Sequence, residues 1–248
     1  MRHIPSRNVG LDFSPDWVIY VDEHLLVFNK PPGLRVLPDG YRPEIEHVRS
    51  LLQPNYGRLW IVHRLDKETS GVLVLARSAQ AHRALNLQFD RRSVEKLYHG
   101  LVRGCPQWEE ITLDYPLRVN GDRRHRTVID FEKGRAAVTV CTRLAAFRGA
   151  ALLAIYPKTG RTHQIRAHLA YLGYPLLGDR LYGFFPSGEF DQSIAFERVA
   201  LHARSISIRH PQTGVPMTFE APYPEDFRTW LERLTPHCIE DWSELSNP

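Results

Sequence analysis

The amino-acid sequence predicts an α+β fold with a mixed, largely antiparallel central β-sheet flanked by helices and loops. Stretches rich in β-branched and apolar residues dominate the middle of the chain. Helical patterns are interspersed among them without the regular alternation of βαβ units. The length of 248 residues suffices for a full hydrophobic core, in one large domain or in two closely fused lobes.

The N-terminal part of the sequence predicts a hairpin followed by a buried strand. Residues 1–16 have little periodicity and are interpreted as an extension. In WVIYVDEHLLVFNKPPG, residues 17–33, two β-rich runs surround the polar residues 22–24, a pattern typical of a hairpin. After a looser segment that contains two prolines, GVLVLA at 71–76 is a continuous apolar run, which is typical of a buried strand.

A helix and another strand are predicted next. Ser78 is a suitable N-cap for the stretch AQAHRALNLQF. In this stretch Ala81, Leu85 and Phe89 recur at helical spacing, so they form an apolar stripe. The run KLYHGLVRG at 96–104 then predicts a strand.

The second half of the chain contains three further strands and two helices. The strands are predicted at 136–144, 150–157 and 199–211, and a short C-terminal helix is predicted near 225–234. In TGRTHQIRAHLAYLG, the residues Ile165, Leu169 and Leu172 share one helical face, and Gly173 supplies a stop signal. Arg166 points away from that apolar face.

These elements define one predicted domain at 17–234, with 235–248 as a C-terminal tail. No run approaches the roughly 18 apolar residues of a membrane span, and the first residues lack the apolar region of a signal peptide. Cys105, Cys141 and Cys238 lie far apart without a C-x-x-C spacing, which argues against a disulfide framework and a zinc site. We therefore expect a soluble, cytoplasmic protein that is a monomer.

The charge of the chain is mildly basic and unevenly distributed. The formal net charge is +4, and the sequence pI is about 9.0. Basic residues concentrate in DRRSVEK at 90–96 and in GDRRHRT at 121–127. Such clusters can neutralise the phosphates of a nucleic acid, but they also occur on solvated loops and helix ends.

Several well-known catalytic motifs are excluded by their spacing. KTGRT at 158–162 resembles a phosphate-binding loop, but a Walker A motif needs Gly at Ile155 and Lys at Arg161. His163 and His168 are five residues apart rather than four, and the Glu of H-E-x-x-H is missing. The sequence also lacks the Gly-x-Ser-x-Gly motif of serine hydrolases. We therefore expect neither a metal nor an organic cofactor.

The remaining candidates for chemistry lie in three segments. They are Asp66 after His63-Arg64-Leu65, Tyr98 on the strand after Lys96, and Arg161 with Arg166 in GRTHQIR. The chain here resembles the RluA family of pseudouridine synthases, through HRLDKETSG, KLYHGLVRG, PKTGRTHQIRAHLAYLGYPLLGDRLYG and LHARSISIRHPQTG followed by FEAP. The early VIYVDEHLLVFNKPPGL resembles that family's opening hairpin. The motifs occur in family order over roughly residues 17–227, and the combination of HRLD-x-x-TSG with TGR-x-HQ-x-R is highly specific.

The resemblance implies an RNA-binding cleft in which uridine is isomerised to pseudouridine, with Asp66 as the catalytic carboxylate. Asp66 can add to C6 of the base, or attack or deprotonate the sugar, and the sequence leaves these alternatives open. A carboxylate in a site that excludes water needs a cation to stay ionised. Arg166, which matches the Arg of HQ-x-R, is the candidate because a guanidinium can pair bidentately. Tyr98 is the candidate platform for the uracil, with its hydroxyl placed to assist proton movement at C5.

Four further residues are candidate RNA contacts. Arg64 can fill the gap left when the target nucleotide flips from its stack, or it can form an ion pair within the fold. Lys30, Arg161 and His163 can contact phosphates or shape the cleft, and a structural role is equally reasonable for each. The resemblance implies transfer RNA or large-subunit ribosomal RNA as the partner. The S4-like N-terminal module of larger relatives is not expected here, which favours a compact stem-loop.

Two alternative functions remain open from the sequence. The first is an RNA-binding protein of the same fold that has lost the reaction, although Asp66, Tyr98 and Arg166 are intact. The second is a glycoside or nucleoside hydrolase that uses Asp66 together with Glu68. Such an enzyme needs two carboxyl groups that face each other across one bond, and loop residues two apart rarely achieve this.

Overall fold

The computed structural model describes residues 13–42, 44–183 and 196–238. Of the predicted extension at 1–16, residues 1–12 lie outside this part, as do residues 239–248 of the predicted tail. The described residues form a ten-stranded sheet, a separate two-stranded sheet and four α-helices. None of the described helices is long and apolar enough to cross a membrane.

The strands and helices follow the predicted order, with several additions. The strands are β1 (Val18–Val21), β2 (Leu25–Lys30), β3 (Trp60–Ile61), β4 (Ser70–Ala76), β5 (Glu95–Arg103), β6 (Glu110–Asp114), β7 (Leu117–Arg118), β8 (Val128–Ile129), β9 (Val138–Phe147), β10 (Ala150–Pro157), β11 (Leu201–Arg209) and β12 (Pro216–Glu220). The helices are α1 (Val48–Tyr56), α2 (Ala79–Asp90), α3 (Gln164–Tyr171) and α4 (Glu225–Leu234), with 3-10 turns at Pro15–Trp17 and Thr235–His237.

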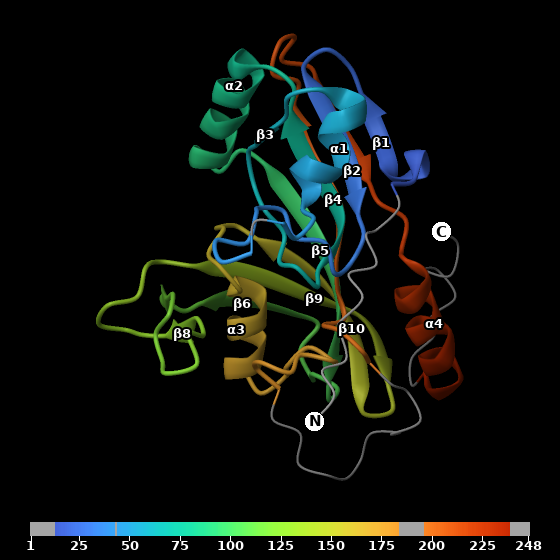
Figure 1. Cartoon of the computed structure of the whole chain (residues 1–248). Coiled ribbons are helices and arrows are strands. Elements are labelled where there is room, and N and C mark those ends of the chain that lie inside the picture. The colour runs from blue at the N-terminus through green and yellow to red at the C-terminus, as the bar shows by residue number, and fades with distance from the viewer. Residues whose placement is uncertain (1–12, 43, 184–195, 239–248) are drawn as a thin grey trace, which may run out of the picture.

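The large sheet has the strand order β1-β2-β4-β11-β5-β10-β9-β6, with β3 paired to β4 and β12 paired to β11. Only the pairing of β11 with β4 is parallel among these described strands, so the mixed, largely antiparallel sheet predicted from the sequence is confirmed. In Figure 1, α1 and α2 lie beside the strands β1 to β4 at the top. Helix α3 lies beside β9 and β10 below, while β8 and its loop extend away from the sheet.

Strand β4 is buried along its whole length because helices cover both of its faces. Val72 and Val74 pack with the α2 residues Ala81 and Leu85. Successive side chains of a strand point to opposite faces. Leu73 and Leu75 therefore lie on the other face of β4, where they pack in a second cluster with residues of α1. The seven residues of β4 are all buried, as the run at 71–76 predicts. The predicted N-cap of α2 is also confirmed, since Ala81 N donates to Ser78 Oγ over 3.1 Å.

Gly71 is the residue that allows β4 to lie parallel to β11. Its φ of +110° is in the region that favours glycine, and a Cβ atom there would lie 2.2 Å from the carbonyl oxygen of Ala203. The register pairs Gly71 with Ala203 on one side and with Lys30 on the other. The loop before β4 is therefore fixed at the centre of the sheet, between the hairpin and β11.

The turn of the β1–β2 hairpin is held by the carboxylate of Asp22. It accepts hydrogen bonds from the backbone N–H groups of His24 and Leu25, both over 2.7 Å, and from the Tyr20 hydroxyl over 2.8 Å. His210 Nε2 lies 2.9 Å from the same carboxylate. Burial alone would raise the pKa of Asp22, but these hydrogen bonds outweigh it and lower the pKa from 3.8 to about 2.

Asp22→Asn is therefore expected to lower the free energy of unfolding by roughly 2 kcal/mol at neutral pH. A carboxylate with a lowered pKa stabilises the fold above its unfolded-state pKa, and this contribution is lost as the pH falls from about 4 to about 2. Denaturant unfolding of both proteins across this pH range measures the difference. If the difference in free energy of unfolding between the parent and Asp22→Asn does not become smaller toward pH 2, the stabilising role of the Asp22 carboxylate is contradicted.

Candidate active site

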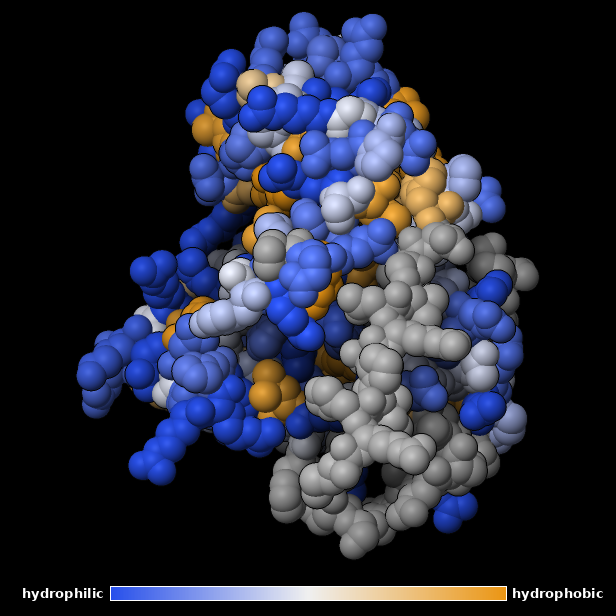
Figure 2. Space-filling view, viewed as in Figure 1, coloured by the Kyte–Doolittle hydropathy of each residue, from blue (hydrophilic) through white to orange (hydrophobic). Residues whose placement is uncertain are grey.

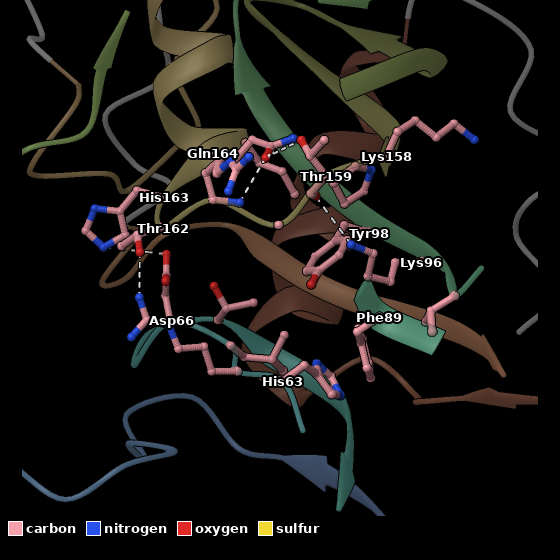
Figure 3. A pocket seen from close by; sticks show the side chains of 18 of the residues that line it. His63, Asp66, Phe89, Lys96, Tyr98, Lys158, Thr159, Thr162, His163 and Gln164 are labelled. Atoms are coloured by element: carbon pink, nitrogen blue, oxygen red, sulfur yellow. Dashed lines mark hydrogen bonds and ion pairs between the residues drawn. The ribbon is translucent and has the colours of Figure 1, made fainter. Parts of the chain in front are cut away.

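A cavity of about 470 Å³ lies where the loop before β4 faces the segment that joins β10 to α3. Most of its lining comes from four parts of the chain: residues 62–66, the C-terminal end of α2, the first half of β5, and residues 157–166. Figure 3 shows side chains from all four parts pointing into this space. Six of the seven predicted site residues line this cavity: Arg64, Asp66, Tyr98, Arg161, His163 and Arg166.

Asp66 lies in the turn that leads into β4. The turn is closed by a hydrogen bond of 3.1 Å from Thr69 N to the Asp66 carbonyl oxygen. The carboxylate is 24% exposed, so it remains accessible to a ligand in the cavity. Its Oδ2 atom lies 3.4 Å from a terminal nitrogen of Arg166 and 3.7 Å from Nε2 of His163. Both distances are longer than a strong charge-assisted hydrogen bond.

Lys30 does not reach the cavity, which corrects the prediction that it contacts RNA phosphates. Its side chain is completely buried, and Nζ donates to the carbonyl oxygens of Pro31, Leu34 and Lys67 over 2.9, 2.9 and 3.1 Å. Burial, followed by the charge of Arg198, lowers the pKa of Lys30 to about 7. Because Lys67 directly follows Asp66, the hydrogen bond from Lys30 to the Lys67 carbonyl connects the end of the hairpin to the loop that carries Asp66.

Arg166 lies beside Asp66 as the sequence predicts, but its bidentate pair is formed with Asp179 rather than with Asp66. Nε and one terminal nitrogen donate to the two oxygens of Asp179 over 2.7 and 2.8 Å. The other terminal nitrogen is left for the longer contact with Asp66. Burial lowers the pKa of Arg166, but the hydrogen bond and charge of Asp179 outweigh it and the pKa is raised. The guanidinium is therefore charged and fixed in direction.

Asp179 and Tyr182 are site residues that sequence reasoning did not single out. The side chain of Asp179 is 0% exposed, and Oδ1 also accepts hydrogen bonds from the backbone N–H groups of Leu181 and Tyr182. The ring of Tyr182 lies under the Arg166 guanidinium at 5.0 Å. The signal was present in GDRLYG at 178–183, where an acidic and an aromatic residue occur in a loop rich in turn residues.

His163 links this group to Asp66. It is the residue before α3 and has a left-handed backbone with φ of 52°. Its Nδ1 lies 3.2 Å from the Tyr182 hydroxyl, and that hydroxyl also accepts a bond of 2.8 Å from Thr127 N. Burial lowers the pKa of His163 despite the nearby charge of Asp66. The ring therefore favours its neutral form, and Arg166 is the permanent cation beside the Asp66 carboxylate.

Tyr98 lies in the middle of the sheet, where it pairs with Ile155 of β10 and Ala203 of β11. Its ring packs against core clusters on both halves of the molecule. In Figure 3 the ring lies between Asp66 and Lys96. Burial, and then the charge of Asp66, strongly raise the pKa of Tyr98. The hydroxyl is therefore protonated at neutral pH and can donate a hydrogen bond to a ligand.

Arg64 and Arg161 line the outer part of the cavity. Arg64 is exposed, and one terminal nitrogen donates to Thr162 Oγ1 over 2.5 Å. Arg161 makes two long contacts of 3.4 and 3.3 Å with the carbonyl oxygen of Ala136. Neither guanidinium has a carboxylate partner among the described residues, so both remain available to an anionic ligand.

The cavity carries a strong surplus of positive charge. Six lysine and arginine side chains line it, against the two carboxylates of Asp66 and Asp90. The resulting surplus of four equals the formal net charge of the entire chain. On the face seen in Figure 2, hydrophilic side chains dominate and hydrophobic ones form small separate groups. An anionic, polar ligand suits this cavity better than an apolar one.

Comparison with known proteins gives consistent matches. Residues 24–171 match the family model described as RNA pseudouridylate synthase. "Ribosomal large subunit pseudouridine synthase D" of Pseudomonas aeruginosa is 39% identical over 233 residues, which cover 88% of this chain and 71% of the relative. "Dual-specificity RNA pseudouridine synthase RluA" of Escherichia coli K12 is 38% identical over 206 residues, covering 83% and 92%. The solved structure "Human RNA Pseudouridylate Synthase Domain Containing 4" has a TM-score of 0.73 and 26% identity, covering 89% and 93%.

Proposed function

The chain belongs to the RNA pseudouridylate synthase family and is an RNA pseudouridine synthase, and we propose that Asp66 is the carboxylate that drives its reaction. The observation that supports this role most strongly is the contact of 3.4 Å between Asp66 and Arg166, whose direction is set by Asp179. Asp90 is the other carboxylate in the described lining, and it is an exposed residue at the end of α2.

The isomerisation breaks the bond between N1 and C1′, turns the uracil, and forms a bond between C5 and C1′. The proton on C5 is lost and N1 gains one, so the reaction needs no net oxidation or hydrolysis. Asp66 supplies a nucleophile or base at the start of this sequence, either at C6 of the base or at the sugar. Arg166 stabilises the negative charge of this carboxylate while the bound nucleotide displaces water.

Tyr98 presents its ring to the uracil and its hydroxyl to the reacting base. Stacking on an aromatic ring holds a flipped base without restricting its rotation to one orientation. Because the raised pKa of Tyr98 keeps the phenol protonated, its first role is to donate a hydrogen bond rather than to accept a proton. We assign Arg64, Arg161 and His163 to contacts with the RNA around the target nucleotide.

The RNA substrate is proposed to be a stem-loop of transfer RNA or of large-subunit ribosomal RNA. The name of one relative, a ribosomal large subunit pseudouridine synthase, supports the ribosomal substrate, and the dual-specificity name of another is compatible with more than one kind of RNA. We further propose that residues 17–234 form the catalytic domain and that the protein acts as a cytoplasmic monomer. Its free cysteines fit a reducing compartment.

Product analysis tests this function directly. The purified protein is incubated with transfer RNA and with ribosomal RNA fragments, which are then digested to nucleosides and separated. We expect pseudouridine to form at the expense of uridine, with no change in mass and no free uracil. Release of uracil would indicate a hydrolase, and bound but unchanged RNA would indicate a protein that binds without catalysis.

A further inference from the structure

The cavity extends beyond the catalytic group toward the end of α2. This second end is lined by His63, Phe89, Arg92, Val94 and Lys96, none of which the reaction described above uses. In Figure 3, Lys96 and Phe89 lie to the right of Tyr98, away from Asp66, and His63 lies below Tyr98 next to Phe89. Lys96 and Tyr98 are two residues apart on β5, so their side chains leave the same face of the strand about 7 Å apart.

Lys96 lacks the partner that a partly buried ammonium normally has. Its one hydrogen bond is a long contact of 3.4 Å to the carbonyl oxygen of Thr159. No carboxylate among the described residues forms an ion pair with it. Burial lowers the pKa of Lys96 to about 8, and no neighbouring charge opposes this effect. An anion that enters the cavity would supply the missing partner.

An aromatic pair lies beside Lys96. The rings of His63 and Phe89 are stacked, with centroids 4.9 Å apart and planes inclined by 25°. Val74 N donates to Nε2 of His63 over 2.9 Å, so this nitrogen is an acceptor and the ring is neutral. Burial, then the charge of Lys96, lowers the pKa of His63 to about 3. The pair therefore offers a flat uncharged surface, as base stacking requires.

Arg92 occupies a position that favours glycine. Its N–H donates to the Phe89 carbonyl and the N–H of Ser93 donates to that of Gln88, which together form a Schellman motif at the end of α2. The residue at this position is left-handed, and Arg92 has φ of 57°. A non-glycine residue there is less stable in this conformation than glycine. Arg92 thus lines the cavity although glycine would make the end of α2 more stable.

We propose that this second end of the cavity binds the nucleotide adjacent to the target uridine. The ammonium of Lys96, with Arg92 at the rim, binds the phosphodiester next to the target, and the His63–Phe89 pair supports the neighbouring base. Lys96 acts as a positioning residue, because it holds the RNA backbone while the target base lies on Tyr98. This inference rests on the proposed function, since it places the target uridine beside Asp66.

The contact between Lys96 and the phosphodiester is tested by replacing that linkage of the RNA with an uncharged one. The probe is an RNA stem-loop on which the parent protein forms pseudouridine, made with either a normal phosphodiester or an uncharged methylphosphonate at each bond next to the target. Lys96→Met is expected to weaken binding of the normal RNA about tenfold. With the methylphosphonate at the contacted bond, parent and variant are expected to bind equally. The slope of log K against log salt is expected to fall in magnitude by about 0.7–0.9 for Lys96→Met.

Two further variants separate this role from a structural one. Lys96→Arg is expected to restore affinity and salt dependence, whereas Arg228→Met, which removes an exposed charge on α4, is expected to change neither. Arg92→Gly is expected to weaken binding while raising the melting temperature by about 2–4 °C. A variant that merely damages the fold would lower both the RNA affinity and the melting temperature.

The inference is overturned if Lys96→Met weakens binding by the same factor with charged and uncharged linkages, or if its salt slope equals that of the parent. That result would leave Lys96 as a packing residue of the cavity wall. Failure of the proposed function is distinct, because the parent protein would then form no pseudouridine on any RNA tested.

Discussion

Asp66→Asn is expected to reduce pseudouridine formation by on the order of 10⁴-fold or more, while RNA affinity and folding stay nearly unchanged. Asparagine has almost the same shape but is neither a base nor an effective nucleophile. The fold should tolerate the change because the contacts of Asp66 with Arg166 and His163 are long, at 3.4 and 3.7 Å. Single-turnover assays with saturating protein separate the chemical step from binding.

Asp90→Asn is the matched control for this variant. It changes the other carboxylate of the described cavity lining, which lies at the far end near Phe89 and Arg92. We expect it to retain the parent's rate of pseudouridine formation. Substantial turnover by a verified Asp66→Asn protein would remove Asp66 from the mechanism, and an equal loss in both variants would point to the charge of the cavity rather than to one catalytic group.

Removal of the Arg166 charge is expected to slow the chemical step. Without a cation 3.4 Å away, the negative charge of Asp66 is less stabilised when the bound nucleotide displaces water. RNA affinity should fall less than the rate. Arg166→Lys should be intermediate, because the charge remains but the fork that binds Asp179 is lost.

The stability of these variants must be measured alongside their rates. Arg166→Met alone leaves the buried carboxylate of Asp179 without its partner, and loss of about 3–5 kcal/mol of stability is expected. The double variant Arg166→Met with Asp179→Asn removes both charges and should fold better than the single variant. A folded double variant with the parent's single-turnover rate would contradict the pairing with Asp66. Weaker RNA binding with a smaller salt slope alone would reassign Arg166 to a phosphate contact.

The sequence predicts best those features that depend on local pattern. The apolar run at 71–76, the Ser78 cap and the stripe of Ala81 and Leu85 are properties of neighbouring residues, and the structure contains each of them. Helix α1 is not predicted from the sequence because Pro54 interrupts its helical pattern. The proline lies near the end of the helix, and a capping box between His47 and Ser50 stabilises the beginning.

The partners of charged residues were harder to predict, because they come from distant parts of the chain. Arg166 and Asp179 meet only once α3 and the following loop have folded together, so the sequence could assign Arg166 to Asp66 but could not identify its stronger partner. The contacts of Lys30 are equally hard to predict from the sequence. Its position at the end of a strand is compatible with a ligand contact, and only the packing of the loop at Lys67 shows that it is buried.

Mapping of pseudouridines in total RNA tests the central claim most directly. RNA is compared from cells with the gene, cells without it, and cells in which either the parent protein or Asp66→Asn has been restored. We predict that pseudouridine disappears at one or a few uridines in stem-loops of transfer or large-subunit ribosomal RNA when the gene is absent. The parent should restore these sites, and Asp66→Asn should not. Unchanged pseudouridine at every site without the gene, or full restoration by Asp66→Asn, would contradict the account.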